Sequence, residues 1–262
     1  MVLIRAVTTT ILMFVFLLFY NKQYLKIRWK DLWCFAGTGI VSIVFFNYCY
    51  FTSITMTSLS VAAVLLYTAP AFVMLFSRIL FKEKLTVQKL AAVALTFAGC
   101  VLVTGLAGGT GSLSPKGILI GLGAGVGYAL YSIFSRFALE RGYNTFTISF
   151  YTFFLAAIGA VPLADVKRTV SIVCAGPDKI AAAFLFGFLS AVLAFLLYTE
   201  GLSRMENGKA AILASIEPVV ATLAGMLVYG ELLSVTEWLG VALVLGAIVL
   251  CNVDPQSQKQ SS

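Results

Sequence analysis

The sequence contains no histidine and few charged side chains, and both shortages narrow the range of functions. Without histidine the chain has no HExxH zinc motif, no Ser-His pair and no histidine-dependent acyl-transfer site. Aspartates that would take over such chemistry are not clustered in pairs. We therefore expect that the protein is not an enzyme and that it uses no metal or other cofactor.

Cysteines and nucleotide-binding motifs are also sparse. The five cysteines are odd in number and scattered, mostly within apolar stretches, which predicts neither a disulfide framework nor a metal pair. A glycine-rich segment at 105–115 lacks the GxxxxGK(S/T) order of a phosphate-binding loop, and we expect it to be a flexible linker. The sequence shows no filter loop or charged ring of the kind that channels use.

Apolar residues are what the chain has in abundance. Hydrophobic residues make up 60% of it and the mean hydropathy is +0.98, whereas soluble domains contain roughly 45–50% apolar residues. Stretches of about 20 apolar residues, long enough to cross a bilayer, recur between short polar breaks. They predict an all-α polytopic membrane protein with nine transmembrane helices, at about 3–20, 32–54, 58–80, 87–105, 117–137, 145–165, 180–202, 208–229 and 233–251.

Lysine and arginine fall unevenly on the two sides of this arrangement. Five of them, Arg5, Lys116, Lys167, Arg168 and Lys179, lie on one side and thirteen on the other. Because cytoplasmic loops retain basic residues, the richer side is expected to be cytoplasmic, with the C-terminus inside and the N-terminus outside. Topology then accounts for the net charge of +7, and no nucleic acid partner is expected. The thirteen residues are Lys22, Lys26, Arg28, Lys30, Arg78, Lys82, Lys84, Lys89, Arg136, Arg141, Arg204, Lys209 and Lys259.

The chain matches itself without a gap when it is shifted by 148 residues, the distance from Pro70 to Pro218. The shift carries the second, third and fourth spans onto the seventh, eighth and ninth. Because this displacement is five helices, an odd number, the second copy is expected to be inverted across the membrane. Further matched pairs are Gly39 and Gly187, Ser42 and Ser190, Tyr50 and Tyr198, Glu83 and Glu231, and Leu95 and Leu243.

The repeat defines the expected domains. Residues 1–105 form a first repeat of four transmembrane helices, 106–115 a linker, 116–252 a second repeat of five helices, and 253–262 a cytoplasmic tail. A five-helix unit would place one more helix before Met1, so either the true start lies upstream or the protein is a nine-helix variant. The first span is expected to be a genuine span and not a signal peptide, because its apolar core is long and no small-x-small cleavage site lies near Asn21.

Two prolines and a glutamate stand near the middle of predicted spans. Pro70 and Pro218 each remove a backbone hydrogen bond and are expected to kink their helices, either around a midplane cavity or only for packing. Glu217 is expected near the bilayer centre, where a carboxylate costs about 2.5–3.5 kcal/mol on insertion scales. It is a candidate for proton coupling or for contact with a cationic substrate group, and the alternative is a neutral acid that stabilises the kink.

Other polar residues are further candidates for a substrate or proton pathway. Glu200 lies near the cytoplasmic end of its span, where it either reaches water or belongs to the pathway. Glu83 and Glu231 follow the two proline helices and are expected to cap the next helix or to pair with a neighbour. For the remaining side chains, cavity lining and ordinary packing both stay open. They are Asn47, Tyr50, Tyr67, Tyr131 and Tyr198, with Tyr48, Tyr128, Ser132 and Ser215 as a wider set.

Glycines recur along the fifth span. Gly117, Gly121, Gly123, Gly125 and Gly127 give overlapping GxxxG spacing. Small residues let helix backbones approach closely in a membrane. Packing within the chain is the favoured interpretation, and a homodimer interface is the alternative.

The proline helices and the residues after them resemble the EamA repeat of the drug/metabolite transporter superfamily. The second copy, KAAILASIEPVVATLA at 209–224 followed by Gly230-Glu231, is the closer match. The first copy, SVAAVLLYTAPA at 60–71 followed by Lys82-Glu83, is looser. The resemblance covers almost the whole chain and implies the usual ten-helix fold of the family, here without its first helix.

The resemblance implies a secondary carrier, often an exporter, that moves amino acids, other small metabolites or drugs by alternating access. We expect such a transporter in the cell membrane, driven by a proton or substrate gradient, with its small-molecule substrate between the proline-bearing helices. The motifs identify the fold well and the substrate poorly. A membrane receptor or scaffold without transport activity is the alternative.

Overall fold

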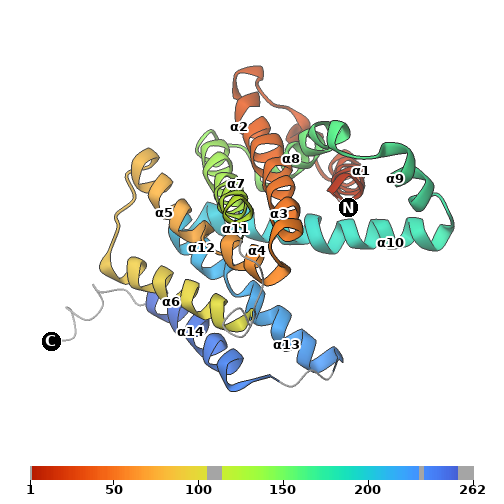
Figure 1. Cartoon of the computed structure of the whole chain (residues 1–262). Helices are drawn as coiled ribbons and strands as arrows, with labels where there is room; N and C mark the ends of the chain where they lie inside the picture. Colours follow the sequence, from red (N-terminus) through yellow and green to blue (C-terminus); the bar gives the residue numbers. More distant parts are fainter. Residues whose placement is uncertain (1, 105–113, 230–232, 253–262) are drawn as a thin grey trace. The chain divides into compact units, whose positions relative to one another are not determined.

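The computed structural model describes residues 2–104, 114–229 and 233–252. Over these ranges the chain is helical and contains no strand (Figure 1). Glu231, the expected linker as far as residue 113, and the tail at 253–262 lie outside the described residues. The helices are α1 (Val2–Tyr20), η1 (Lys22–Leu25), η2 (Trp29–Asp31), α2 (Leu32–Ala36), η3 (Gly37–Val44), α3 (Phe45–Met56), α4 (Leu59–Leu66), α5 (Ala69–Leu80), α6 (Val87–Val103), α7 (Pro115–Glu140), α8 (Thr145–Ala160), η5 (Val161–Leu163), α9 (Val166–Val173), α10 (Pro177–Gly187), η6 (Phe188–Leu193), α11 (Ala194–Arg204), α12 (Asn207–Ala214), α13 (Glu217–Tyr229) and α14 (Val235–Asn252).

Each apolar stretch found in the sequence coincides with an apolar helix or with a run of joined helices. Within the described residues, eight such segments are long and apolar enough to cross a bilayer. The stretch expected at 87–105 is α6, a shorter apolar helix of 17 residues. The chain is therefore an all-helical polytopic membrane protein, as its composition predicts.

Five of these spans are made of more than one helical segment. Trp29–Met56 joins η2, α2, η3 and α3, and Pro177–Arg204 joins α10, η6 and α11. In both of these, a π-helical segment interrupts the α-helix, at Gly37–Val44 and at Phe188–Leu193. The two π-helical segments overlap when the chain is shifted by the repeat distance, so the local backbone recurs along with the sequence. Such segments are rare and are frequently found at functional sites.

The chain divides into two compact units, which are described separately. Unit 1 contains Met1–Tyr48 and Leu130–Met205, and unit 2 contains Cys49–Ala129 and Glu206–Ser262. The division falls inside α3, inside α7 and between α11 and α12. Each unit therefore takes helices from both of the expected sequence repeats.

Unit 1 is built around α8, which packs against α1, α2 and η3. Two apolar clusters fill the spaces beside α8: one centres on Met13 and Leu17 of α1, the other on Phe35 of α2 and Ile148 of α8. These side chains are fully buried or nearly so. Dispersion contacts of this kind hold membrane helices together, because lipid offers apolar helices no hydrophobic gain on association.

Unit 2 contains two helix pairs, α6 with α14 and α5 with α12. Met74 and Ile212 belong to one cluster of this unit, and Val73 and Ala211 to another. The helices begin at polar caps where the sequence provides them. Ser58 Oγ accepts a hydrogen bond from the Val61 N–H before α4, and Thr86 Oγ1 accepts one from the Lys89 N–H before α6.

The glycine face of α7 packs within unit 2. A Cβ added to Gly117 would lie 2.7 Å from Thr57 Cγ2, and one added to Gly121 would lie 2.7 Å from Ser53 Oγ. Gly125 in turn lies against Thr68. Three of the five glycines thus serve close packing against α3, α4 and the turn after α4, which is the intramolecular interpretation of their spacing.

Candidate functional site

The two proline-bearing spans are broken at matching points. In the first, α4 ends at Leu66 and α5 begins at Ala69, and in the second, α12 ends at Ala214 and α13 begins at Glu217. The shift of 148 residues places one break on the other. The sequence predicted a kink in a continuous helix, and the structure shows two short helices joined by a turn.

Proline chemistry explains why the helices restart where they do. Pro70 and Pro218 are each the second residue of the new helix, a position where the missing N–H costs nothing and the fixed backbone angle suits the first turn. Neither proline can donate to the carbonyl four residues earlier, which belongs to Leu66 in one copy and to Ala214 in the other. Both of those residues line the same pocket.

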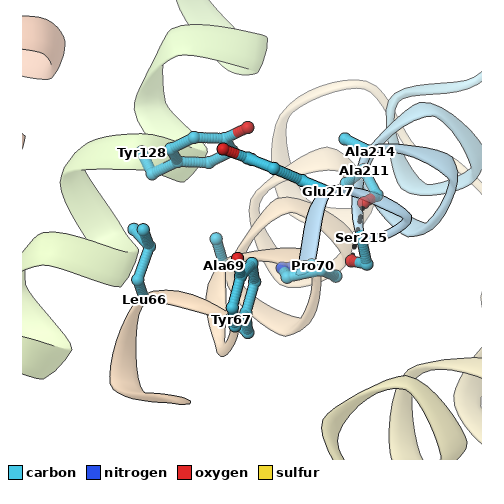
Figure 2. Close-up of a pocket in the computed structure, with 9 residues that line it drawn as sticks. All are labelled: Leu66, Tyr67, Ala69, Pro70, Tyr128, Ala211, Ala214, Ser215 and Glu217. Carbon is cyan, nitrogen blue, oxygen red and sulfur yellow. Dashed lines mark hydrogen bonds between the residues drawn. The ribbon is translucent and has the colours of Figure 1, made fainter. Parts of the chain in front are cut away.

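A small pocket, open on one side, lies at these breaks. Figure 2 shows its lining residues converging from α4, α5, α7, α12 and α13. Three pairs of them are repeat partners: Leu66 and Ala214, Tyr67 and Ser215, and Ala69 and Glu217. The complete lining is Leu66, Tyr67, Ala69, Pro70, Tyr128, Ala211, Ala214, Ser215 and Glu217.

The pocket combines one carboxylate with phenol rings and small apolar side chains. Glu217 is exposed instead of being packed into the interior of the chain, while Pro218 beside it is buried. The Glu217 carboxylate and the Tyr128 hydroxyl point toward one another (Figure 2). Tyr67, and Tyr50 on α3, lie within electrostatic range of Glu217. No lysine or arginine is among the nine lining residues.

A carboxylate beside aromatic faces is a setting that favours a cation over an anion. The carboxylate supplies the opposite charge, and phenol rings attract cations through their π-electrons. Small side chains such as Ala69 and Ala211 give the rest of the lining an apolar surface. Ser215 Oγ donates a hydrogen bond to the Ala211 carbonyl at 3.2 Å.

The predicted pathway residues divide between the two units. Pro70, Tyr67 and Glu217 line the pocket, and Pro218 and Tyr50 belong to the same unit as it. The other four are in unit 1, where they make contacts of their own. They are Asn47, Tyr131, Tyr198 and Glu200.

In unit 1, two hydroxyl pairs join α7 to α11. The hydroxyl groups of Tyr131 and Thr199 lie 2.6 Å apart, and those of Ser132 and Tyr198 lie 2.8 Å apart. Tyr131 and Thr199 are both buried. Such contacts across helices are typical of membrane helix packing.

Asn47 and Glu200 also have partners within unit 1. The buried Asn47 donates a hydrogen bond from Nδ2 to the Ile43 carbonyl at 2.7 Å. Glu200 pairs with Arg204 one turn further along α11, with 2.7 Å between Oε1 and Arg204 Nη2. It also accepts a hydrogen bond from Thr145 Oγ1 at 2.9 Å.

Glu83 has a partner in α12 and does not cap the next helix, α6, which Thr86 caps. Its Oε1 atom accepts a hydrogen bond from the Asn207 backbone N–H at 3.0 Å, so it caps the start of α12 from a distant part of the chain. Close by, Lys89 forms an ion pair with Glu206. Neither Lys89 nor Glu206 stands out in the sequence. Each is an ordinary charged residue in a loop or at the end of a helix, and only the folded structure shows that they form a pair.

Several pocket residues were also outside the sequence-based candidates. Leu66, Ala69, Ala211 and Ala214 are ordinary apolar residues of apolar helices. A usable signal was present, since Leu66 and Ala214 are the repeat partners that stand four residues before the two prolines. Tyr128 was among the wider set of aromatic candidates and is now placed in the lining.

Comparison with known proteins places the chain in a family. The sequence profile of the EamA-like transporter family matches residues 1–105 and 115–253. An uncharacterized transporter of Bacillus subtilis, YwfM, is 25% identical over 231 residues, covering 87% of this chain and 76% of that protein. The uncharacterized inner membrane transporter YedA of Escherichia coli is 30% identical over 194 residues, covering 74% of this chain and 61% of that protein.

Similarity extends to an archaeal protein and to a solved structure. An uncharacterized transporter of Archaeoglobus fulgidus is 28% identical over 206 residues, covering 77% of this chain and 70% of that protein. One crystal structure superposes with a TM-score of 0.79 over 100% of this chain and 89% of the other, at 22% identity, which shows a shared fold. With both halves of its sequence matched, the chain belongs to the EamA-like transporter family of integral membrane transporters and is not an enzyme.

Proposed function

We propose that the protein is a secondary-active carrier that moves a small molecule across the cell membrane by alternating access, with the pocket at the paired helix breaks as its substrate site. The observation that carries this proposal is the composition of the pocket. Its lining contains three pairs of residues that are equivalent in the two sequence copies. Carriers built from inverted repeats bind their substrate where broken helices of the two copies meet.

The membrane arrangement that goes with this function follows from the repeat and from the charges. We propose nine membrane-spanning helices in two inverted repeats, 1–105 and 116–252, with the C-terminus in the cytoplasm. The resemblance to exporters of the superfamily supports outward transport. The short helix α6 then crosses the membrane beside α14, its repeat partner.

The chemistry of the pocket supports a substrate with a cationic group, such as an organic amine. Glu217 supplies the charge, and Tyr67 and Tyr128 supply aromatic faces. An ionisable residue in the middle of a membrane span costs several kilocalories per mole and is kept mainly where it binds a solute or carries a proton. We propose that protons and the cationic substrate compete for Glu217, which couples the two fluxes.

Counterflow in proteoliposomes tests transport directly. Purified protein is reconstituted, loaded with an unlabelled solute, and exposed to the labelled form of the same solute, using amines, amino acids and anions in parallel at two pH values. A carrier accumulates label transiently for its own substrates, whereas a receptor or scaffold accumulates none. Failure of every solute in the panel to exchange would contradict the proposal, and exchange of anions alone would contradict the assignment of substrate charge.

A further inference from the structure

A cluster of polar contacts joins α5, α6 and α12 at the end of unit 2 that carries Lys82, Lys84 and Lys209, here called the lysine-rich end. Lys89 Nζ lies 2.5 Å from Glu206 Oε2, and it also donates a hydrogen bond to the Lys84 carbonyl at 3.0 Å. The Lys89 side chain is only 6% exposed, so these partners replace the water that would otherwise surround its ammonium group.

In a second set of contacts, the acidic residue comes from the first half of the sequence and its partners come from the second half. Glu83, just after α5, accepts the Asn207 N–H at 3.0 Å and lies 3.5 Å from the Gly208 nitrogen. Asn207 Nδ2 donates a hydrogen bond to Ser77 Oγ on α5 at 3.1 Å. A carboxylate at a helix N-terminus satisfies N–H groups that have no partner inside the helix, and it also complements the helix dipole. Each half of the chain therefore contributes one acid that binds the other half.

The cluster holds the same two helices that line the pocket. On α5, Ser77 lies seven residues after Pro70, which corresponds to about 10 Å along the helix. On α12, Asn207 lies at the start of the helix, and the pocket residues Ala211 and Ala214 follow within two turns. The cluster is therefore displaced toward the lysine-rich end on both helices.

No space separates the helices between the cluster and the pocket. A Cβ added to Gly208 would lie 3.0 Å from Met74 Cγ, and Val73 and Ala211 belong to one buried cluster nearby. A solute in the pocket therefore has no route between α5 and α12 to the lysine-rich end while these contacts are in place. Separation of the two helices at this end would have to break the polar contacts first.

The polar contacts of this cluster can separate without a large energetic cost. The Glu206 side chain is 44% exposed, so water replaces its partner readily when the ion pair separates. Among the described residues, the buried Asn207 side chain is held by its single donated hydrogen bond, from Nδ2 to Ser77 Oγ at 3.1 Å.

We propose that Ser77, Glu83, Lys89, Glu206 and Asn207 form a latch that keeps the lysine-rich end of the pocket closed. The latch goes beyond the proposed transport function but relies on its central idea, that the pocket opens to each side in turn. Breaking the ion pair shifts the balance of states toward the one that is open at the lysine-rich end. The latch is therefore defined by accessibility of the pocket, which is measured without any transported solute.

The test uses a reporter cysteine in the pocket. Ala214→Cys is introduced together with Cys174→Ser, because Cys174 is the exposed one of the cysteines and the other four are buried. Labelling by a membrane-impermeant thiol reagent is measured separately in right-side-out and inside-out vesicles. The Cys174→Ser chain without the reporter gives the background rate.

Lys89→Met or Glu206→Gln is then added to the reporter chain. We expect each to speed labelling from the lysine-rich side roughly tenfold, a change that corresponds to about 1.4 kcal/mol, and to slow labelling from the other side. The exchange of charges in Lys89→Glu with Glu206→Lys should restore slow labelling. Lys84→Met is the matched control, because it removes an exposed positive charge from the same loop without touching the ion pair.

The labelling rates either support the latch or contradict it. Labelling rates that stay at the level of the Lys84→Met control would overturn the latch, and so would an equal increase from both sides, which indicates general loosening. If Lys89→Met does not fold, Glu206→Gln alone provides the test. Glutamine has the size of glutamate, and the Glu206 side chain is 44% exposed, so this variant should fold. A chain that switches accessibility but exchanges no solute would keep the latch and contradict the transport function.

Discussion

Gly99 on α6 and Gly240 on α14 face each other so closely that a Cβ on either residue would lie 2.8 Å from the backbone carbonyl oxygen of the other. The neighbouring atoms are mostly backbone or β-branched side chains, which cannot move aside easily. A Cβ on Gly240 would also meet the Val103 nitrogen at 2.8 Å. The most extensive helix contact in unit 2 thus depends on two residues without side chains.

Substitution of Gly240 by alanine should therefore destabilise the protein. Gly240→Ala forces α6 and α14 apart, and overpacking of this kind costs about 1–3 kcal/mol. We expect a lower apparent Tm in detergent, measured by the unfolding of purified protein. Gly246→Ala is the control on the same helix, because a Cβ there meets nothing within 4 Å. Equal Tm values for the two variants would show that the close approach does not matter.

Removal of the Glu217 charge should impair transport of cationic solutes. In Glu217→Gln the amide keeps the shape of the side chain but loses the ion pair with a bound cation, which is worth about 1.5–3 kcal/mol, so we expect a loss of roughly ten- to a hundredfold in counterflow rate. The wild-type rate should rise with pH, because deprotonation of Glu217 frees it for the cation, and the variant should show a flat profile.

A control variant shows whether this effect is specific to the pocket. Glu140→Gln removes an exposed carboxylate at the end of α7, more than three helical turns beyond the lining residue Tyr128, and should leave rate and pH profile unchanged. A flat pH profile in the wild-type protein, with undiminished transport in Glu217→Gln, would remove Glu217 from both substrate binding and coupling.

The hydroxyl pair of Tyr131 and Thr199 allows a double-mutant cycle. Tyr131→Phe leaves the buried Thr199 hydroxyl without this partner, and an unsatisfied buried hydroxyl costs about 1–3 kcal/mol. Thr199→Val in the same chain removes that hydroxyl, so the double variant should recover part of the lost stability. Tm measurements on the four chains give the coupling.

The same four chains separate packing from a pathway role. If Tyr131 serves packing alone, counterflow by the folded variants should match the wild type once it is normalised for folded protein. A specific loss of transport with unchanged Tm would instead place Tyr131 in the substrate or proton path. Additive effects on Tm would show that the pair contributes little.

The proposed inversion of the two repeats predicts opposite sides of the membrane for two equivalent segments. A short epitope tag inserted after Leu80 should be accessible from the cytoplasm, and one inserted after Tyr229 should be accessible from outside, because lysines follow α5 and none follows α13 before α14. Antibody binding to intact and to permeabilised cells distinguishes the two cases. Tags that report the same side would exclude an inverted repeat.

The length and composition of the apolar stretches predicted most of the fold. A stretch of about 20 apolar residues has few alternatives to a membrane helix, since every backbone group must be satisfied within it. The breaks inside the proline spans were only partly predictable. Pro70 and Pro218 show that the helical hydrogen bonds are interrupted, but whether a helix bends or restarts depends on what packs beside it.

The site was predictable to the extent that it depends on chemistry that is rare in membranes. Glu217 stands out because a carboxylate is unusual in the middle of a span, and its neighbours on α4 and α5 follow from the repeat. The contacts of Lys89 with Glu206, and of Glu83 with Asn207, join residues more than a hundred positions apart. Each of these residues has an ordinary local explanation, so only the packing of α5, α6 and α12 reveals the pairing.

The repeat partners in the pocket lining have diverged unequally. Where one copy has Ala69 the other has Glu217, and where one has Tyr67 the other has Ser215. The helix breaks are therefore present in both copies, whereas the carboxylate and the phenol ring are each present in only one. A solute with a charged head and an apolar tail would find one favourable orientation in such a cavity, head toward α13, and would keep that polarity throughout every cycle of transport.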